Sequence, residues 1–384
     1  MNAKPIVLLL ALCALAAGYA EGSGKSWFRD EPVRVGVIAT MTGENAGNGR
    51  TISDTARLAA DQVNAAGGLD LGGKARRVQV VVLDDLNSPA GAVDAARALI
   101  HREDVAAIVG PQFSRNAIPA SRIAEDTGIP MICPMSTNPE TTRGKRYVFR
   151  IPYLDTFQGT VMARFAWSRL EARRAAVLFD VANVYNREIA GVFRKAFTGL
   201  GGEVVAFERY TTDQARDYAA QLARIAAAGP QVLYLPNYAA EVEVQARQAR
   251  ELGIDAVLLG SDGWDDGRFK NLPSFQGSYL TRHWHPDIDT EASRRFLRDF
   301  NARYDRVPDD VAATFFDAFQ LLFAAIRLEG SADPSRIRDG LYRLEGFQGV
   351  TGTIEYRECG DPVKSAVIIE IRGGESSFYT QVEP

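Results

Sequence analysis

Two hydroxyl-bearing segments of this sequence follow apolar runs and could bind an anionic group. Ser114 comes shortly after the run Val105–Val109, and Thr137 comes shortly after the run Ile129–Cys133. If such runs form parallel strands, their carboxyl ends meet at one sheet edge, and the following helices direct free backbone N–H groups outward there. A ligand carboxylate would fit at that edge. The alternative is plain helix capping, by Ser114 and by Thr137 together with Glu140.

A third segment could bind a cation. Residues 260–267 read Gly-Ser-Asp-Gly-Trp-Asp-Asp-Gly and again follow an apolar run. Asp262 could pair with a ligand cation and Trp264 could cover an apolar group, although an aspartate turn in a solvated acidic loop is the common alternative. Tyr185 and Tyr238 occupy corresponding loops, where an aromatic side chain more often packs than contacts a ligand.

The motifs of familiar enzymes are incomplete in this chain. Residues 22–26 resemble the end of a phosphate-binding loop, but Tyr19 stands where that loop requires its first glycine. Ile52 replaces the third glycine of a dinucleotide fingerprint that would begin at Gly47. His283 and His285 could grip a metal, but no third ligand is suitably spaced. The sequence therefore predicts no catalytic residue, metal or cofactor, and a secreted nucleotide-dependent enzyme remains a minor alternative.

The N-terminus has the features of an export signal. Lys4 supplies a positive charge, Ile6–Ala17 is apolar, and small residues follow at Gly18 and Ala20. This pattern predicts a signal peptide over residues 1–20, cleavage after Ala20 and release into the periplasm. An N-terminal membrane anchor and lipid attachment at Cys13 are the alternatives.

Composition excludes several classes of protein. The chain has 384 residues, of which 46% are hydrophobic and 24% charged, as is usual for soluble globular proteins. Its net charge of -4 offers no general attraction to phosphate, so a nucleic-acid partner is not expected. After export, Cys133 and Cys359 could form a disulfide or remain free thiols, and the sequence leaves both open.

Apolar runs typical of buried strands alternate with helical periodicity in two successive sets. The strands of the first set are expected at Val33–Ala39, Val78–Leu83, Val105–Val109 and Ile129–Cys133, and those of the second at Ala175–Phe179, Val204–Phe207, Val232–Leu235 and Ala256–Leu259. Short strands are expected again at Thr351–Tyr356 and Ala366–Ile371. This order predicts an α/β protein whose parallel sheets are covered by helices and divided between two similar lobes.

A series of short motifs runs from Val33 to Ile371. It comprises Gly36-Val37, Met41-Thr42-Gly43, Asn64 to Leu69, Asp84-Asp85, Asn87-Ser88-Pro89, Val109-Gly110-Pro111, Ser114, Pro134, Thr137 to Glu140, and Gly260 to Trp264. In their order and spacing, these motifs resemble the periplasmic solute-binding proteins of the branched-chain amino acid (Leu/Ile/Val-binding) type. Proteins of this type are the extracytoplasmic receptors of ABC importers.

The resemblance implies a fold and a mode of action. The fold is the type I periplasmic binding protein fold, with two Rossmann-like lobes joined by a three-crossing hinge. Lobe 1 would comprise residues 33–154 and 283–362, and lobe 2 residues 155–282 and 363–384. The protein would be a monomer that closes around a small ligand, delivers it to a membrane permease and converts nothing.

The resemblance also implies roles for the candidate site residues. Ser114 and Thr137 would hold the α-carboxylate of an amino acid. The carbonyl of Met135, the hydroxyl of Thr137 and the carboxylate of Asp262 would hold its α-ammonium group. Aromatic side chains at Tyr185 and Tyr238 would line the pocket from lobe 2.

Other positions bear on the ligand's side chain. Phe113 and Trp264 are neighbours of the motif positions, and Met135 and Ser136 replace smaller residues common in the family. Asn48 stands near the place of a family aromatic, which argues against strict preference for Leu, Ile or Val. Binding of an amide, a urea or an aromatic carboxylate by the same fold remains the principal alternative.

Overall fold

The first sheet of the structure, a computed structural model, has five parallel strands in the order β4-β1-β5-β6-β7. The structure describes residues 31–211 and 216–384, so the expected signal peptide lies outside the described residues. The strands are β1 (Val33–Ala39), β4 (Val78–Asp84), β5 (Ala107–Val109), β6 (Met131–Cys133) and β7 (Val148–Arg150). Most of their residues are apolar because helices cover both faces of the sheet.

Helices from distant parts of the sequence form those covers. On one face, Val35 and Val37 pack with α1 (Ala46–Ala65) and α10 (Asp310–Glu329). On the other face, Ile38 and Ile108 pack with α2 (Pro89–His101) and α3 (Ser114–Thr127). The smaller elements of this part are β2 (Leu69–Asp70), β3 (Ala75–Arg76), η1 (Pro139–Thr141), α9 (Glu291–Tyr304), α11 (Pro334–Arg343), β13 (Phe347–Gly349) and β14 (Gly352–Ile354).

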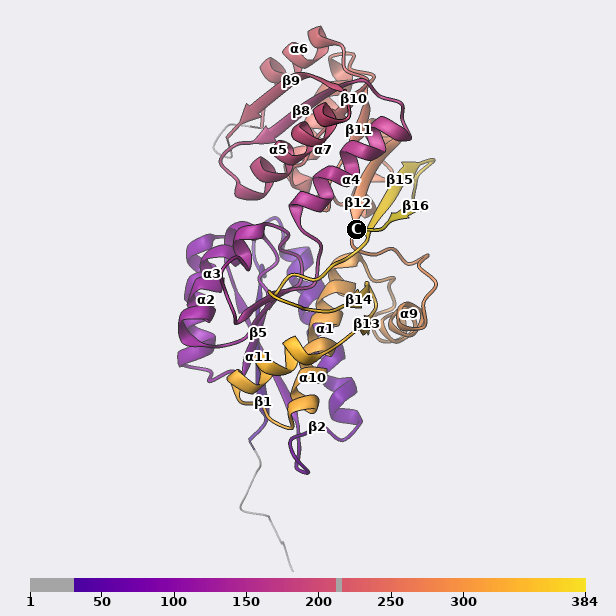
Figure 1. The fold of residues 1–384 in the computed structure, drawn as a ribbon. Helices are drawn as coiled ribbons and strands as arrows, with labels where there is room; N and C mark the ends of the chain where they lie inside the picture. Colours follow the sequence, from indigo (N-terminus) through magenta and orange to yellow (C-terminus); the bar gives the residue numbers. More distant parts are fainter. Residues whose placement is uncertain (1–30, 212–215) are drawn as a thin grey trace, which may run out of the picture. The chain divides into compact units, whose positions relative to one another are not determined.

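The second sheet has seven strands in the order β16-β15-β12-β11-β10-β8-β9 (Figure 1). The strands are β8 (Arg174–Asp180), β9 (Glu203–Tyr210), β10 (Val232–Tyr234), β11 (Val257–Leu259), β12 (Ser278–Arg282), β15 (Ala366–Arg372) and β16 (Glu375–Val382). Its helices are α4 (Asp155–Ser168), α5 (Val184–Gly199), α6 (Ala219–Ala228) and α7 (Ala239–Glu251), with the short turns α8 (Asp266–Phe269) and η2 (Pro273–Phe275). In this sheet the pairs β12–β15 and β15–β16 are antiparallel, and the other neighbouring strands are parallel.

The predicted α/β class with helix-covered parallel sheets is therefore confirmed. The strand expected at Thr351–Tyr356 is present as the shorter β14, which pairs with β13, a strand that was not predicted. Segments 151–154, 283–290 and 355–365 connect elements of the two sheets. The expected lobe boundaries stay a prediction, because residues 32–384 cluster as one compact unit.

Helix α10 is the one helix of the described residues that is long and apolar enough to span a membrane. In its most apolar window, 78% of the residues are buried inside the protein. Phe315, Phe319 and Leu322 are fully buried against the first sheet and helix α1. The apolar residues of α10 therefore form part of the core that packs against the first sheet.

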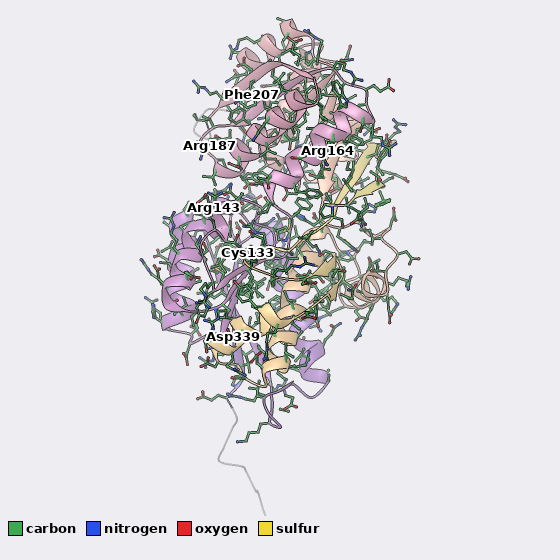
Figure 2. The ribbon with its side chains drawn as sticks, in the orientation of Figure 1. Cys133, Arg143, Arg164, Arg187, Phe207 and Asp339 are labelled. Carbon is green, nitrogen blue, oxygen red and sulfur yellow. The ribbon has the colours of Figure 1, made fainter. Side chains whose placement is uncertain are left out.

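The two cysteines of the described residues are free thiols. Cys133 is fully buried at the end of β6 (Figure 2), and burial raises the pKa of its thiol to about 12. Cys359 lies exposed in the segment after β14. The structure therefore does not contain the disulfide that the sequence left open.

Helix α1 approaches the chain after β1 so closely that only glycine fits at position 49. A Cβ atom there would lie 2.0 Å from the carbonyl oxygen of Thr40. We expect Gly49→Ala to destabilise the protein by about 1–3 kcal/mol, because the backbone would have to move. Urea unfolding measures the change. Gly191→Ala in helix α5 is the control, since no atom lies within 4 Å of its Cβ position and alanine favours a helix. Equal loss of stability in both variants would contradict this reading.

Candidate ligand-binding site

A cavity of about 870 Å³ lies where loops from the two sheets face each other. Its volume is within the usual range of small-molecule sites, roughly 300–1,000 Å³. Of the candidate site residues, Asn48, Phe113, Ser114, Met135, Thr137, Tyr185, Tyr238, Asp262 and Trp264 line it. The structure therefore brings together every sequence-predicted position except Ser136.

Ser114 and Ser136 form a hydrogen-bonded pair at the start of α3. Ser114 is the first residue of the helix and not its N-cap, which is Phe113. The hydroxyl of Ser136 donates to Ser114 Oγ at 3.0 Å and lies 2.7 Å from Thr141 Oγ1. Because Ser136 is fully buried, it supports Ser114 from behind and does not border the cavity.

Thr137 borders the cavity with a buried hydroxyl that has no hydrogen-bond partner. The expected capping box with Glu140 does not form, because Asn138 caps η1 by accepting from the Glu140 backbone N–H. The hydroxyl faces the buried Asp155 carboxylate, but the two groups do not meet hydrogen-bond geometry. A buried hydroxyl without a partner is costly, so Thr137 is suited to bind a ligand.

Arg150 holds the loop that carries these residues. Its fully buried guanidinium donates to the carbonyl oxygens of Ser136 (2.8 Å) and Asn138 (3.0 Å). It also donates to Thr142 Oγ1 and to the carboxylate of Asp361, both at 2.6 Å. Arg150 was not predicted to belong to the site, although an arginine that ends an apolar strand could have drawn attention to it.

Asp262 follows β11 and presents a buried carboxylate surrounded by donors. Its Oδ1 accepts from Gln158 Nε2 and Tyr185 Oη, both at 2.6 Å, and its Oδ2 lies 3.1 Å from His283 Nε2. Burial by itself raises the pKa of Asp262, but His283, Tyr185 and Gln158 together outweigh burial and lower it. The carboxylate is therefore charged at neutral pH and held in one orientation.

Gln158 and His283 were not predicted to belong to the site. His283 was considered as a metal ligand, but the described residues contain no group of three His, Cys, Asp or Glu side chains arranged for a metal. Instead, its ring packs against Tyr153, with ring centroids 4.4 Å apart. Tyr153 and His283 both lie in segments that connect the two sheets. Through its hydrogen bond with His283, Asp262 therefore contacts one of these connecting segments.

Aromatic side chains meet across the cavity. The rings of Tyr185 and Tyr238 stack with centroids 5.3 Å apart. Tyr238 also meets the edge of Phe113 at 5.0 Å, and the guanidinium of Arg115 lies over both of these rings. At the rim of the cavity, the carboxylate of Glu44 accepts from Arg216 at 2.6 and 2.8 Å. Side chains from loops of the two sheets therefore contact one another directly.

Trp264 differs from its expected role. The indole N–H donates to the carbonyl oxygen of Leu235 at 2.8 Å, and the ring packs against Phe269 and Phe275. Only 2% of the side chain is exposed. The ring therefore fills the core beneath the loop instead of covering a ligand.

Comparisons with known proteins identify the family of this chain. Residues 32–375 match the family model of periplasmic binding proteins. The chain belongs to this family. The predicted family resemblance is thus confirmed, and the family is one of solute-binding receptors.

The relatives of this periplasmic binding protein are similar over nearly their whole lengths. The leucine-, isoleucine-, valine-, threonine- and alanine-binding protein of Pseudomonas aeruginosa is 28% identical over 92% of each chain. The structure of the leucine-binding protein LivK of Thermotoga maritima is 31% identical, with a TM-score of 0.85 and coverage of 92% of this chain and 99% of that one. LivJ of Streptococcus pneumoniae, solved with isoleucine, is 27% identical with a TM-score of 0.84, covering 92% and 100%.

Proposed function

We propose that this periplasmic binding protein is the receptor of an ABC importer and binds an amino acid in the cavity between the two sheets. The observation that carries the proposal is that one cavity contains both a carboxylate that could bind a cationic group and hydroxyl groups that could bind an anionic group. Asp262 offers a fixed negative charge, while Ser114 and the unpartnered Thr137 offer hydroxyl groups near a helix start. The names of the relatives, which refer to leucine and isoleucine, support the same class of ligand.

The proposed assignment follows the charges of a zwitterion. Ser114 and Thr137 bind the ligand's α-carboxylate. The Met135 carbonyl oxygen, the Thr137 hydroxyl and Asp262 bind its α-ammonium group. Both ligand charges are costly to remove from water, so hydrogen bonds already fixed in the protein must replace their hydration.

Closure around the ligand follows from where these groups lie. Ser114 and Thr137 belong to loops of the first sheet, whereas Tyr185, Tyr238 and Asp262 belong to loops of the second. A ligand bound to the first set gains the second set only in the closed state. The ligand therefore favours closure by this difference in contacts.

The wider assignments belong to the same proposal. The chain is exported with cleavage after Ala20, acts in the periplasm as a monomer and delivers its ligand to a membrane permease. It performs no catalysis and needs no cofactor.

Calorimetry with the ligand-free protein tests the proposal. We expect at least one L-amino acid to bind, and its analogue without the amino group to bind far more weakly. An analogue that binds equally well would instead favour an amide, a urea or an aromatic carboxylate as the ligand.

The Thr137 hydroxyl offers a specific test. We expect Thr137→Val, which preserves the shape of the side chain, to weaken amino-acid binding by about 1–3 kcal/mol through loss of its hydrogen bonds. Titration calorimetry measures the difference from the unchanged protein. Thr198→Val on the exposed side of α5 is the control and should bind normally. Normal binding by Thr137→Val would remove this residue from the site.

A further inference from the structure

The cavity extends well beyond the groups proposed to bind the zwitterion. Its lining continues along the start of α8, the end of β12 and the start of α10, at Asp265, Asp266, Arg282, Asp309 and Asp310. We call this group the distal subsite. It adjoins Asp262, because the Asp262 carbonyl oxygen accepts a hydrogen bond from Arg282 Nη1 at 3.2 Å.

Arg282 is already neutralised within the distal subsite. Its Nε donates to Asp266 at 2.9 Å, and its Nη1 lies 3.3 Å from the carboxylate of Asp310. The same Nη1 donates to the carbonyl oxygen of Asp262 at 3.2 Å. Since 9% of the arginine side chain is exposed and its donors are engaged, Arg282 is poorly placed to bind an anionic ligand.

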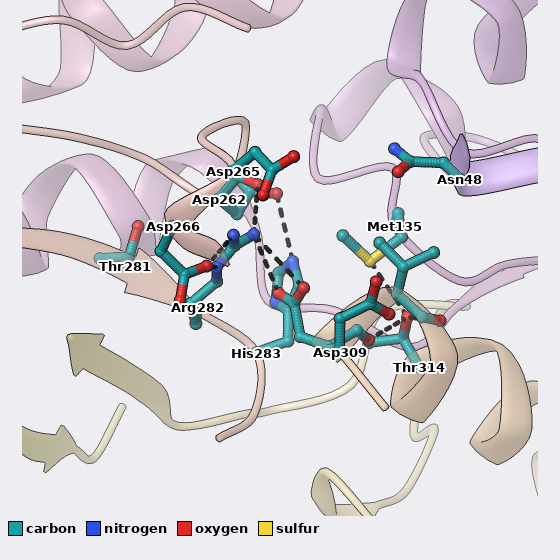
Figure 3. A network of polar contacts seen from close by, with 12 residues as sticks. Asn48, Met135, Asp262, Asp265, Asp266, Thr281, Arg282, His283, Asp309 and Thr314 are labelled. Carbon is teal, nitrogen blue, oxygen red and sulfur yellow. Dashed lines mark hydrogen bonds and ion pairs between the residues drawn. The ribbon is translucent and has the colours of Figure 1, made fainter. Parts of the chain in front are cut away.

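Asp265 and Asp309 each have a carboxylate oxygen, Oδ2, that is not used in helix capping and could accept a hydrogen bond from a ligand. Each uses Oδ1 to cap a helix, Asp265 by accepting from the Arg268 N–H (3.0 Å) and Asp309 by accepting from the Ala312 N–H (2.8 Å). Both residues are exposed and line the cavity. Figure 3 shows Asp265 beside Asp262 and Asp309 near Met135 and Thr314. Across from them, Asn48 donates to Gln112 at 3.3 Å, so that border of the cavity is polar as well.

The cavity as a whole carries excess negative charge. Six carboxylates line it, at Glu44, Asp262, Asp265, Asp266, Asp309 and Asp310, against four cations at Arg216, Arg268, Lys270 and Arg282. With every carboxyl group ionised and histidine neutral, the formal net charge of this lining is -2. Burial raises the pKa of Asp309 to about 6, so this carboxyl group is still mostly ionised at pH 7. A neutral zwitterion leaves that excess unchanged, and an aliphatic side chain would desolvate carboxylates without replacing their hydration.

We infer that the amino acid bound here carries a second cation on its side chain, as lysine, ornithine and arginine do, and that Asp309 and Asp265 bind this cation. The inference rests on the proposed function, which supplies the position of the zwitterion. It does not rest on the carboxylates alone, because the cavity also contains the buried, unpartnered Thr137 hydroxyl.

Lysine and norleucine separate the distal subsite from the rest of the cavity, since they differ by the side-chain ammonium group. We expect the unchanged protein to bind lysine at least about tenfold more tightly than norleucine, with a preference that weakens at high salt. Asp309→Asn should remove most of this preference by weakening lysine alone. Asparagine caps helices as well as aspartate does, so the fold should be preserved.

The controls separate the possible outcomes. Asp94→Asn on exposed helix α2 should change neither affinity, and Asp265→Asn combined with Asp309→Asn should abolish the preference. Equal affinity for lysine and norleucine, or a preference that survives both substitutions, would overturn the inference and leave the proposed function standing. Absence of binding by any amino acid would instead overturn the proposed function itself.

Discussion

Replacing Asp262 with alanine is expected to weaken amino-acid binding by about 2–5 kcal/mol, the range for removing one partner of a buried charge pair. Gln158, Tyr185 and His283 hold this carboxylate in place before a ligand arrives. The substitution therefore removes the proposed partner of the ligand's ammonium group and also leaves these protein donors facing one another without an acceptor.

Titration calorimetry with the best amino-acid ligand measures this effect. Because the donors left by Asp262→Ala are buried, thermal unfolding must show that the variant remains folded at the temperature of the titration. Asp255→Ala, at an exposed position before β11, is the matched control and should bind as the unchanged protein does. Unchanged affinity in folded Asp262→Ala would exclude the proposed ammonium contact.

Replacing Arg150 with methionine is expected to lower the free energy of unfolding by about 3–5 kcal/mol. Methionine can fill the buried space but donates no hydrogen bond. The carbonyl oxygens of Ser136 and Asn138 would lose their donor, and Asp361 would lose its ion pair. Since these residues flank Thr137, ligand affinity should fall together with stability.

Urea unfolding, compared with a variant of the same loop, measures the cost of Arg150→Met. Arg143 pairs with Glu140 at the surface, where both side chains are more than half exposed. Because exposed ion pairs contribute little, Arg143→Met should cost less than about 1 kcal/mol. Similar losses in the two variants would mean that the buried network does not hold the loop.

The elements that could be predicted are those whose signal lies within a short stretch of sequence. Strands β6 and β10 appear as continuous apolar runs because helices cover both of their faces. By contrast, β12 reads Ser-Tyr-Leu-Thr-Arg, and its pairing with β11 and β15 depends on residues far away in the chain. No local sequence pattern predicts such a strand.

The candidate site shows the same division. Ser114, Thr137 and Asp262 were found because each follows a strand, and ligands bind at the carboxyl ends of parallel strands. The partners that hold them could not be found in this way. Gln158 meets Asp262 across 104 positions, and Arg150 meets Asp361 across 211. Trp264 was found as a neighbour of Asp262, but the direction of its ring depends on the packing of the core.

The contacts between the two sides of the cavity bear on how an importer could avoid futile cycles. Glu44 and Arg216 are 61% and 45% exposed, so their ion pair contributes at most about 1 kcal/mol to the shut form. That free energy changes the ratio of shut to open receptor by less than about tenfold, and it acts whether or not cargo is present. The ion pair of Glu44 and Arg216 therefore cannot by itself distinguish a ligand-bound receptor from an empty one. That information must come from the charged groups deeper in the cavity, where an empty receptor and a loaded one differ.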